Sequence, residues 1–252
     1  MADFWNALSL TPLEGAALAV IAFLAGVIRG FTGFALSAFA LSTAVLILPP
    51  IELIPMLFWL EAGASLFMLR AGLRDADRRA AVTLLAGAAV GTFIGIGLTV
   101  ALDVGVSRIL ALGLLISLAA LQLARLRMAI LATPAGTVGA GFAAGIANGL
   151  AGVGGMVVAL YVLARDAEPR TMRATLVLYL FLGMLTSLLA HLWWGTMTRT
   201  ATARGLALVP LCLAGVWLGA RFFTPAWQRY YKAICLWLLI GLALIALGRS
   251  VL

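Results

Sequence analysis

Apolar stretches follow one another along almost the whole chain, with short polar segments between them. At 1.5 Å per residue, most are long enough to cross all or much of a roughly 30 Å hydrocarbon layer as helices. We therefore predict helical elements over residues 12–28, 34–48, 52–70, 80–101, 106–124, 134–148, 153–164, 172–193, 205–222 and 231–248. Three of them, 34–48, 134–148 and 153–164, reach only about 18–23 Å, which indicates broken or re-entrant elements.

The composition fits a protein surrounded by lipid. Hydrophobic residues make up 64% of the 252 residues, only 10% are charged, and the mean hydropathy is +1.15. An ordinary soluble domain has about 25% charged residues, and no soluble fold of this size hides so much apolar surface. The sequence excludes a soluble enzyme and a disordered chain, and it predicts an all-α polytopic membrane protein.

The charge is strongly positive, with 17 Lys and Arg against 9 Asp and Glu. Because the cations lie in short gaps between apolar stretches, where they fix topology, we expect no nucleic-acid partner. Residues 1–15 contain Asp3 and Glu14 but no Lys or Arg, so we expect no cleaved signal peptide. Cys212 and Cys235 lie inside apolar stretches and are interpreted as core residues.

Two glycine-rich segments indicate an internal duplication. Gly26–Phe34 (GVIRGFTGF) matches Gly145–Val153 (GIANGLAGV) at an offset of 119 residues, and Gly91–Gly95 matches Gly215–Gly219 at an offset of 124. We predict two transmembrane repeats, 1–130 and 131–252.

The distribution of cations bears on whether the repeats are parallel or inverted. If each glycine-rich segment is the tip of a hairpin, each repeat has five elements and the second repeat is inverted. One face then collects twelve cations and the other four, the bias that the positive-inside rule expects. This arrangement places the N-terminus outside and the Arg70–Arg79 loop in the cytoplasm. An arrangement with eight full crossings places nine cations on one face and seven on the other, and it stays open as an alternative.

In the inverted arrangement, the two hairpin tips enter from opposite faces and meet near the membrane midplane. Helix N-termini that start after Gly33 and Gly154 direct partial positive charge at the same volume, which favours an anion. The candidate substrate-binding residues are Arg29, Gly30, Thr32, Gly33, Asn148, Gly149, Gly152 and Gly154. Other glycines are interpreted as sites of close helix packing: Gly87, Gly91, Gly95, Gly215 and Gly219.

Arg29 and Glu61 are charged residues inside apolar stretches. An intramembrane cation costs about 2.5–3.5 kcal/mol on insertion scales, and a guanidinium suits an oxyanion. Glu61 either pairs with Arg29 or titrates and couples protons to transport, and we favour the ion pair. His191, beside Trp193 and Trp194, is interpreted as an interfacial residue. No catalytic, metal-binding or cofactor motif is found in the sequence.

The paired glycine motifs resemble the sulfite exporter TauE/SafE family, also called TSUP transporters, over residues 12–248. The resemblance is carried by Gly26–Phe34 with Pro49 and Pro50, and by Gly145–Gly155 with Arg173-Ala174-Thr175. It implies secondary transport, as an exporter, of a small sulfur-containing anion such as sulfite, sulfoacetate or thiosulfate across the bacterial cytoplasmic (inner) membrane. The sequence does not identify a coupling ion, and a proton and sodium both stay open for that role.

The first tip departs from the family pattern. It reads Gly33-Phe34-Ala35-Leu36, where members often have a further glycine, which leaves the backbone approach and the substrate size open. Two alternatives also stay open: a transporter of a non-anionic solute or metal ion, and a non-transporting membrane scaffold.

Overall fold

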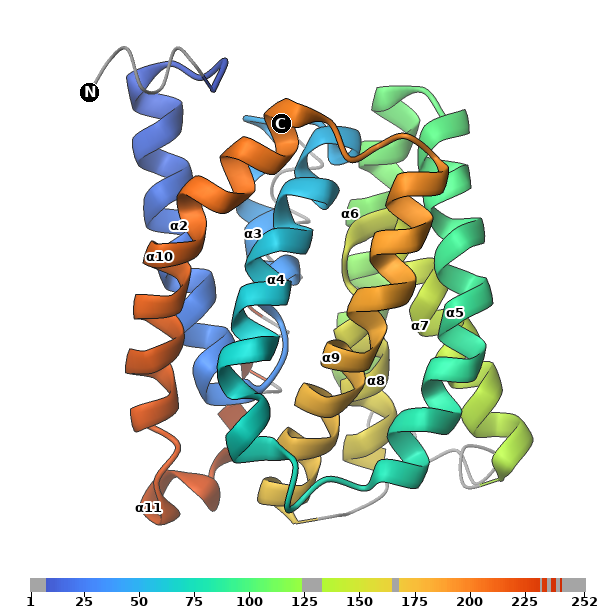
Figure 1. Ribbon diagram of the computed structural model, residues 1–252. Coiled ribbons are helices and arrows are strands. Elements are labelled where there is room, and N and C mark those ends of the chain that lie inside the picture. The colour runs from blue at the N-terminus through green and yellow to red at the C-terminus, as the bar shows by residue number, and fades with distance from the viewer. Residues whose placement is uncertain are drawn as a thin grey trace.

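The computed structural model describes residues 8–123, 133–164 and 168–231, together with residues 233, 234, 237, 238 and 241. Within these residues the chain is helical and contains no strand (Figure 1). The helices are α2 (Pro12–Thr32), α3 (Leu36–Ala44), α4 (Pro50–Gly72), α5 (Arg78–Ala101), α6 (Val104–Leu123), α7 (Pro134–Ala151), α8 (Gly154–Ala164), α9 (Pro169–Trp193), α10 (Arg199–Arg221) and α11 (Pro225–Gln228).

Local sequence explains where many of the helices begin. A proline occupies an early position of α2, α4, α7, α9 and α11, where its missing N–H is not needed. The side chains of Thr11, Asp77, Thr133 and Thr198 accept a hydrogen bond from the first turn of α2, α5, α7 and α10. A helix lies in each predicted element from 12–28 to 205–222, although α3 covers only Leu36–Ala44 of the predicted 34–48. Most of 231–248 lies outside the described residues.

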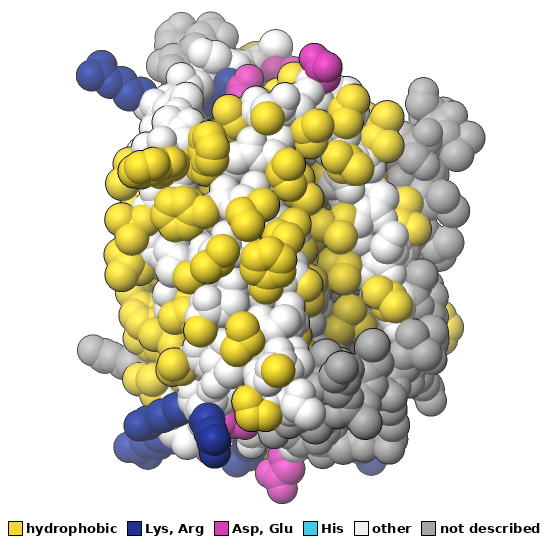
Figure 2. Space-filling view, turned by 90° about the vertical axis from the view of Figure 1, so that its right-hand side faces the viewer, with side chains coloured by type: hydrophobic (Ala, Val, Ile, Leu, Met, Phe, Trp, Pro, Cys, Tyr) yellow, Lys and Arg dark blue, Asp and Glu magenta, His cyan; other side chains and the backbone are white. Residues whose placement is uncertain are grey.

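The predicted class, an all-α polytopic membrane protein, is also confirmed. Five helices (α2, α4, α5, α9 and α10) are long and apolar enough to cross a membrane. Large aliphatic side chains such as Val90, Ile109 and Leu185 are exposed, as a lipid-facing surface requires. Figure 2 shows such side chains covering the middle of one face, with charged side chains at its two ends.

The helices break at both glycine-rich tips. α2 ends before Gly33, whose φ of 84° lies in the left-handed region that glycine adopts most easily, and α7 ends before Gly152, with φ 65°. Ala35, before α3, also has positive φ, 69°. At the second tip, the helix before the break is longer than the helix after it: α7 extends about 27 Å and α8 about 16 Å. The 134–148 element is therefore longer than predicted, because the helix continues past Gly149.

The two breaks touch each other. A Cβ on Gly152 would lie 3.4 Å from Cβ of Ser37, in the first turn of α3. A Cβ on Gly155, in the first turn of α8, would lie 3.6 Å from Cβ of Phe34. Segments about 119 residues apart in the sequence therefore meet inside the protein.

Glycines bring two pairs of long helices into backbone contact. In α5 and α7, a Cβ on Gly87, Gly91, Gly141 or Gly145 would collide with a backbone carbonyl of the other helix. The same holds between α2 and α10 at Gly26, Gly30, Gly215 and Gly219. The close packing expected for Gly87, Gly91, Gly95, Gly215 and Gly219 is thus present, and each pair joins one helix from each predicted repeat.

These pairs organise the described helices into two groups, which form the left and right halves of Figure 1. The left group contains α2, α3, α4 and α10, and the right group contains α5, α7, α8 and α9. The groups meet mainly where α4 packs on α9. In Figure 1, α2 begins near the top and α7 near the bottom. Each group therefore combines the first three elements of one predicted repeat with the fourth element of the other.

Candidate substrate site

A small cavity lies between the two groups, beside the helix breaks. Its volume is about 60 Å³, enough for a few water molecules at about 10–15 Å³ each. The left group contributes Ser37 from α3 and Ile54, Phe58 and Glu61 from α4. The right group contributes Ala88, Thr92, Asn148, Gly152, Tyr179, Leu180, Gly183, Met184, Thr186, Ser187 and His191, from α5, α7 and α9. Residues from both groups therefore share one chamber, which is lined by both polar and apolar side chains.

Hydrogen-bond donors line the right-hand side of this cavity. Asn148 Nδ2 donates to Ser187 Oγ at 3.1 Å, so the hydroxyl proton of Ser187 remains for a ligand. Thr92 adds a second hydroxyl. Thr186 instead donates to Gly183 O on its own helix at 2.9 Å. The lining can therefore donate to the oxygens of a small acceptor through Ser187 and Thr92.

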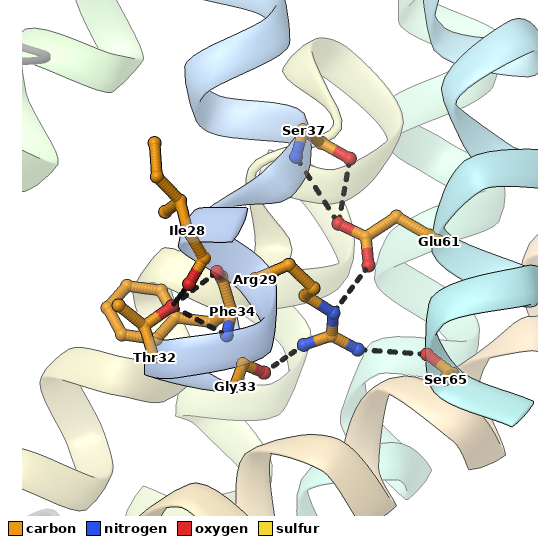
Figure 3. A network of polar contacts seen from close by, with 8 residues as sticks. All are labelled: Ile28, Arg29, Thr32, Gly33, Phe34, Ser37, Glu61 and Ser65. Atoms are coloured by element: carbon orange, nitrogen blue, oxygen red, sulfur yellow. Dashed lines mark hydrogen bonds and ion pairs between the residues drawn. The ribbon is translucent and has the colours of Figure 1, made fainter. Parts of the chain in front are cut away.

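Arg29 and Glu61 form an ion pair at the left-hand wall (Figure 3). Arg29 is 0% exposed, and its Nε lies 3.3 Å from Glu61 Oε2. Its guanidinium also donates to Gly33 O and, at 2.9 Å, to Ser65 Oγ. Arg29, on α2, is thus bonded to the break that ends α2 and to α4. It is not among the residues that line the cavity.

Glu61 connects this pair to the start of α3. Its Oε1 accepts hydrogen bonds from Ser37 N at 3.3 Å and from Ser37 Oγ at 2.9 Å (Figure 3). The carboxylate therefore satisfies an N–H of the first turn of α3, which has no side-chain cap of its own. The ion-pair geometry favoured from the sequence is present, and the pair presents a neutral sum of charge to the cavity.

The other residues predicted at the first tip organise the break itself. Thr32 Oγ1 lies 2.8 Å from Ile28 O and 2.7 Å from Phe34 O, and it accepts from Phe34 N at 3.2 Å. The carbonyl of Gly33 accepts from Arg29, and Gly30 packs against α10. Thr32, Gly33 and Gly30 are not among the cavity-lining residues.

At the second tip, Asn148 and Gly152 line the cavity, whereas Gly149 and Gly154 do not. Gly149 packs against α5, and its carbonyl accepts from Thr99 Oγ1 at 2.9 Å. Gly154 lies against the side chain of Asn148. The structure therefore brings together Asn148, Gly152 and Glu61 from the predicted set and places the others behind them.

The sequence analysis interpreted His191 as an interfacial residue and did not place it in the site, whereas the structure buries it there. The side chain is 3% exposed and lines the cavity, and its ring meets that of Phe58 edge to face at a centroid distance of 6.0 Å. A signal for it existed in the sequence. Four of the lining residues on α9 recur every fourth position, which places them on one helix face: Tyr179, Gly183, Ser187 and His191.

Arg173 was also missed as a structural residue, although it belongs to the family motif. From α9 it donates to Phe31 O at 3.1 Å and to Gly30 O at 2.5 Å, and its guanidinium carbon lies 4.5 Å from the ring centroid of Phe223. Carbonyls at a helix C-terminus carry partial negative charge, so a cation is favourable there. Arg173 thereby links the right group to the end of α2.

Comparison with known proteins gives a family match. The family model described as sulfite exporter TauE/SafE matches residues 18–246. No curated protein and no solved structure matches the chain. The family match covers nearly the whole sequence and agrees with the broken, apolar helices described above. The chain therefore belongs to the sulfite exporter TauE/SafE family, whose members are membrane transporters and not enzymes.

Proposed function

We propose that this protein is a secondary transporter that exports a small sulfur-containing anion, such as sulfite, sulfoacetate or thiosulfate, across the bacterial cytoplasmic membrane. The observation that carries the proposal is a cavity with several polar side chains beside two touching helix breaks. Irregular backbone at membrane depth is tolerated where it is buried in protein or lines a cavity, and transporters place substrates there. Family membership supports the same substrate class.

In this proposal the anion contacts the cavity lining, and Arg29 acts behind it. The oxygens of a small oxyanion accept from Ser187 Oγ, Thr92 Oγ1 and the amide of Asn148. Arg29 fixes the position of Glu61 and of the first helix break, so it is a positioning residue in the present state. The predicted glycines Gly30, Gly33, Gly149 and Gly154 set the backbone path that makes room for the lining.

The transport motion is proposed to separate the two helix groups. α2 with α10, and α5 with α7, touch backbone to backbone, so neither pair slides without collisions. The contact between α4 and α9, which borders the cavity, is the boundary that opens. The opposite directions of α2 and α7 in Figure 1 support two inverted repeats, 1–130 and 131–252. The cation bias of the sequence supports an N-terminus outside.

The proposal is tested by flux in proteoliposomes. Purified protein is reconstituted, and movement of sulfite, sulfoacetate and thiosulfate is followed against empty vesicles. Ser187→Ala should lower the flux because it removes a cavity donor. Ser117→Ala is the matched control, since Ser117 is exposed on α6 and donates only to Gly113 O of its own helix, at 2.8 Å. No flux of any sulfur anion, or an equal loss in both variants, would refute the proposal.

A second candidate is transport of a non-anionic solute, and the Arg29–Glu61 pair favours it because it leaves Arg29 without a free charge for an anion. A thermal-shift screen with sulfite, thiosulfate, sulfoacetate, sulfate and neutral solutes separates the candidates. Stabilisation by neutral solutes alone selects the second candidate, whereas stabilisation by a sulfur anion selects the first.

A further inference from the structure

We propose that the transported anion binds together with one proton, and that His191 Nε2 holds this proton. The inference rests on the proposed function, because it assumes that a sulfur anion occupies the cavity. It identifies the coupling ion, which the sequence left as either proton or sodium.

The hydrogen bonds around His191 are compatible with a neutral ring that carries its proton on Nδ1. His191 Nδ1 lies 2.7 Å from Thr196 Oγ1, and the same hydroxyl lies 3.3 Å from His191 O. A hydroxyl has a single proton, and the carbonyl can only accept it. With the hydroxyl donating to His191 O, Thr196 Oγ1 accepts from Nδ1–H, and Nε2 of the neutral ring is left with a lone pair. Since Nδ1 is engaged, Nε2 is the ring nitrogen that is available to a ligand in the cavity.

The charges around the cavity leave an incoming anion without a partner. Glu61 on α4 is paired with Arg29, and Glu52 on α4 is paired with Arg204 at 2.6 Å. The remaining titratable lining residue besides His191 is Tyr179 on α9. The lining residues of α3, α5 and α7 are Ser37, Ala88, Thr92, Asn148 and Gly152, and none of them carries a charge.

An unbalanced charge in such a cavity is unfavourable, and one proton corrects it. Burial favours the neutral ring while the cavity holds no anion, because an isolated buried cation is poorly solvated. An anion within hydrogen-bond distance favours the imidazolium instead. A proton from water then occupies the Nε2 lone pair as the anion enters, and it leaves for water when the anion leaves. Binding thus takes up one proton, and affinity falls as the pH rises.

The chain contains a single histidine, so the protonation of this ring can be observed directly. The protein is produced with isotope-labelled histidine, purified through a tag without histidine, and placed in nanodiscs near neutral pH. Nuclear magnetic resonance signals of the ring ¹⁵N atoms are recorded with and without saturating sulfite or thiosulfate. Binding of the anion is verified by tryptophan fluorescence. We expect the Nδ1–H tautomer in the empty protein and imidazolium signals with the anion bound.

The outcomes separate this inference from the proposed function. If neither anion binds, and sulfoacetate does not bind either, the proposed function fails and this inference fails with it. If an anion binds and the ring stays neutral, only this inference is overturned.

A variant gives a second readout with the anion that binds. Affinity in the wild type should fall about tenfold for each pH unit, the slope of one linked proton. His191→Gln keeps a hydrogen-bonding group without a titrating one, so it should lose this proton-linked fall. An unchanged pH profile in the Gln variant would overturn the inference, and the nuclear magnetic resonance measurement decides where the variant does not fold.

Discussion

The ion pair between Arg29 and Glu61 makes a quantitative prediction about stability. Arg29→Met removes the cation, so Glu61 loses its counter-charge and Ser65 Oγ and Gly33 O lose their donor. Removing one partner of a buried ion pair destabilises a protein by about 3–5 kcal/mol. At about 2–4 °C per kcal/mol for a chain of this length, Tm should fall by about 6–20 °C.

The double variant Arg29→Met with Glu61→Gln should recover most of this loss. Replacing both partners of a buried pair by neutral side chains is often close to neutral. The introduced glutamine keeps an amide oxygen for Ser37 N and Ser37 Oγ, so the start of α3 stays satisfied. Arg74→Met, in the exposed turn after α4, is the matched control and should stay within about 0.5 kcal/mol of the wild type.

Thermal unfolding followed by tryptophan fluorescence, in detergent, measures these differences. The reasoning is refuted if the double variant is no more stable than Arg29→Met, since the two charges would then act independently. Flux in the stable double variant decides what Arg29 does. We expect transport to persist at a lower rate, because Arg29 does not line the cavity. A stable double variant without flux would instead assign the anion contact to Arg29.

Three further predictions follow from the packing. Gly91→Ala should lower Tm by the equivalent of about 1–3 kcal/mol because its Cβ meets Phe142 O, whereas Gly113→Ala, with nothing within 4 Å, should be neutral. A disulfide between Phe34→Cys and Gly155→Cys, at a Cβ separation of 3.6 Å, should form in a background without Cys212 and Cys235. This disulfide should stop transport, and a reductant should restore transport. Unaltered flux in the oxidised protein would contradict the proposed separation of the groups. Arg173→Lys should lower Tm because an ammonium does not reproduce two carbonyl contacts together with stacking on Phe223.

The sequence predicts the helices well because hydropathy, prolines and caps all mark the same places. It also predicts both breaks, since Gly33 and Gly152 adopt left-handed backbone that other residues disfavour. The extent of α7 could not be predicted in this way. Glycines weaken an isolated helix, but those of α7 are held against α5, where the absence of Cβ permits contact between backbones. A local propensity therefore gives the wrong end for a helix that packs this closely.

The candidate site was less predictable than the fold. Asn148, Gly152 and Glu61 stand out as polar or glycine residues within apolar stretches, and the cavity contains them. His191 was assigned by its aromatic neighbours, although its spacing from Ser187 places both on one helix face. Arg29 is conspicuous for its cost in a membrane, but cost alone does not distinguish a ligand contact from an internal ion pair.

Two cations that entered the topology count are also internal. Arg173 bonds to the end of α2, and Arg204, 4% exposed, donates to Glu52 and at 2.8 Å to Leu8 O. One was counted on each face, so the bias toward the predicted cytoplasmic face survives their removal. The count responds to the type of residue and its position in the chain, and it carries no information about what each cation binds.

The two repeats predicted from the sequence and the two helix groups of the structure divide the chain differently. Glycine motifs indicate that a helix packs closely against another helix, but they do not identify which helix that is. Here Gly91 of the first predicted repeat meets α7 of the second, and Gly215 of the second meets α2 of the first. Because backbone contacts of this kind resist sliding, neither repeat can move as a separate body. Each group therefore contains one long helix of the other predicted repeat, and the cavity lies at the boundary between the groups. Ser37 on one side of this boundary faces Gly152 on the other.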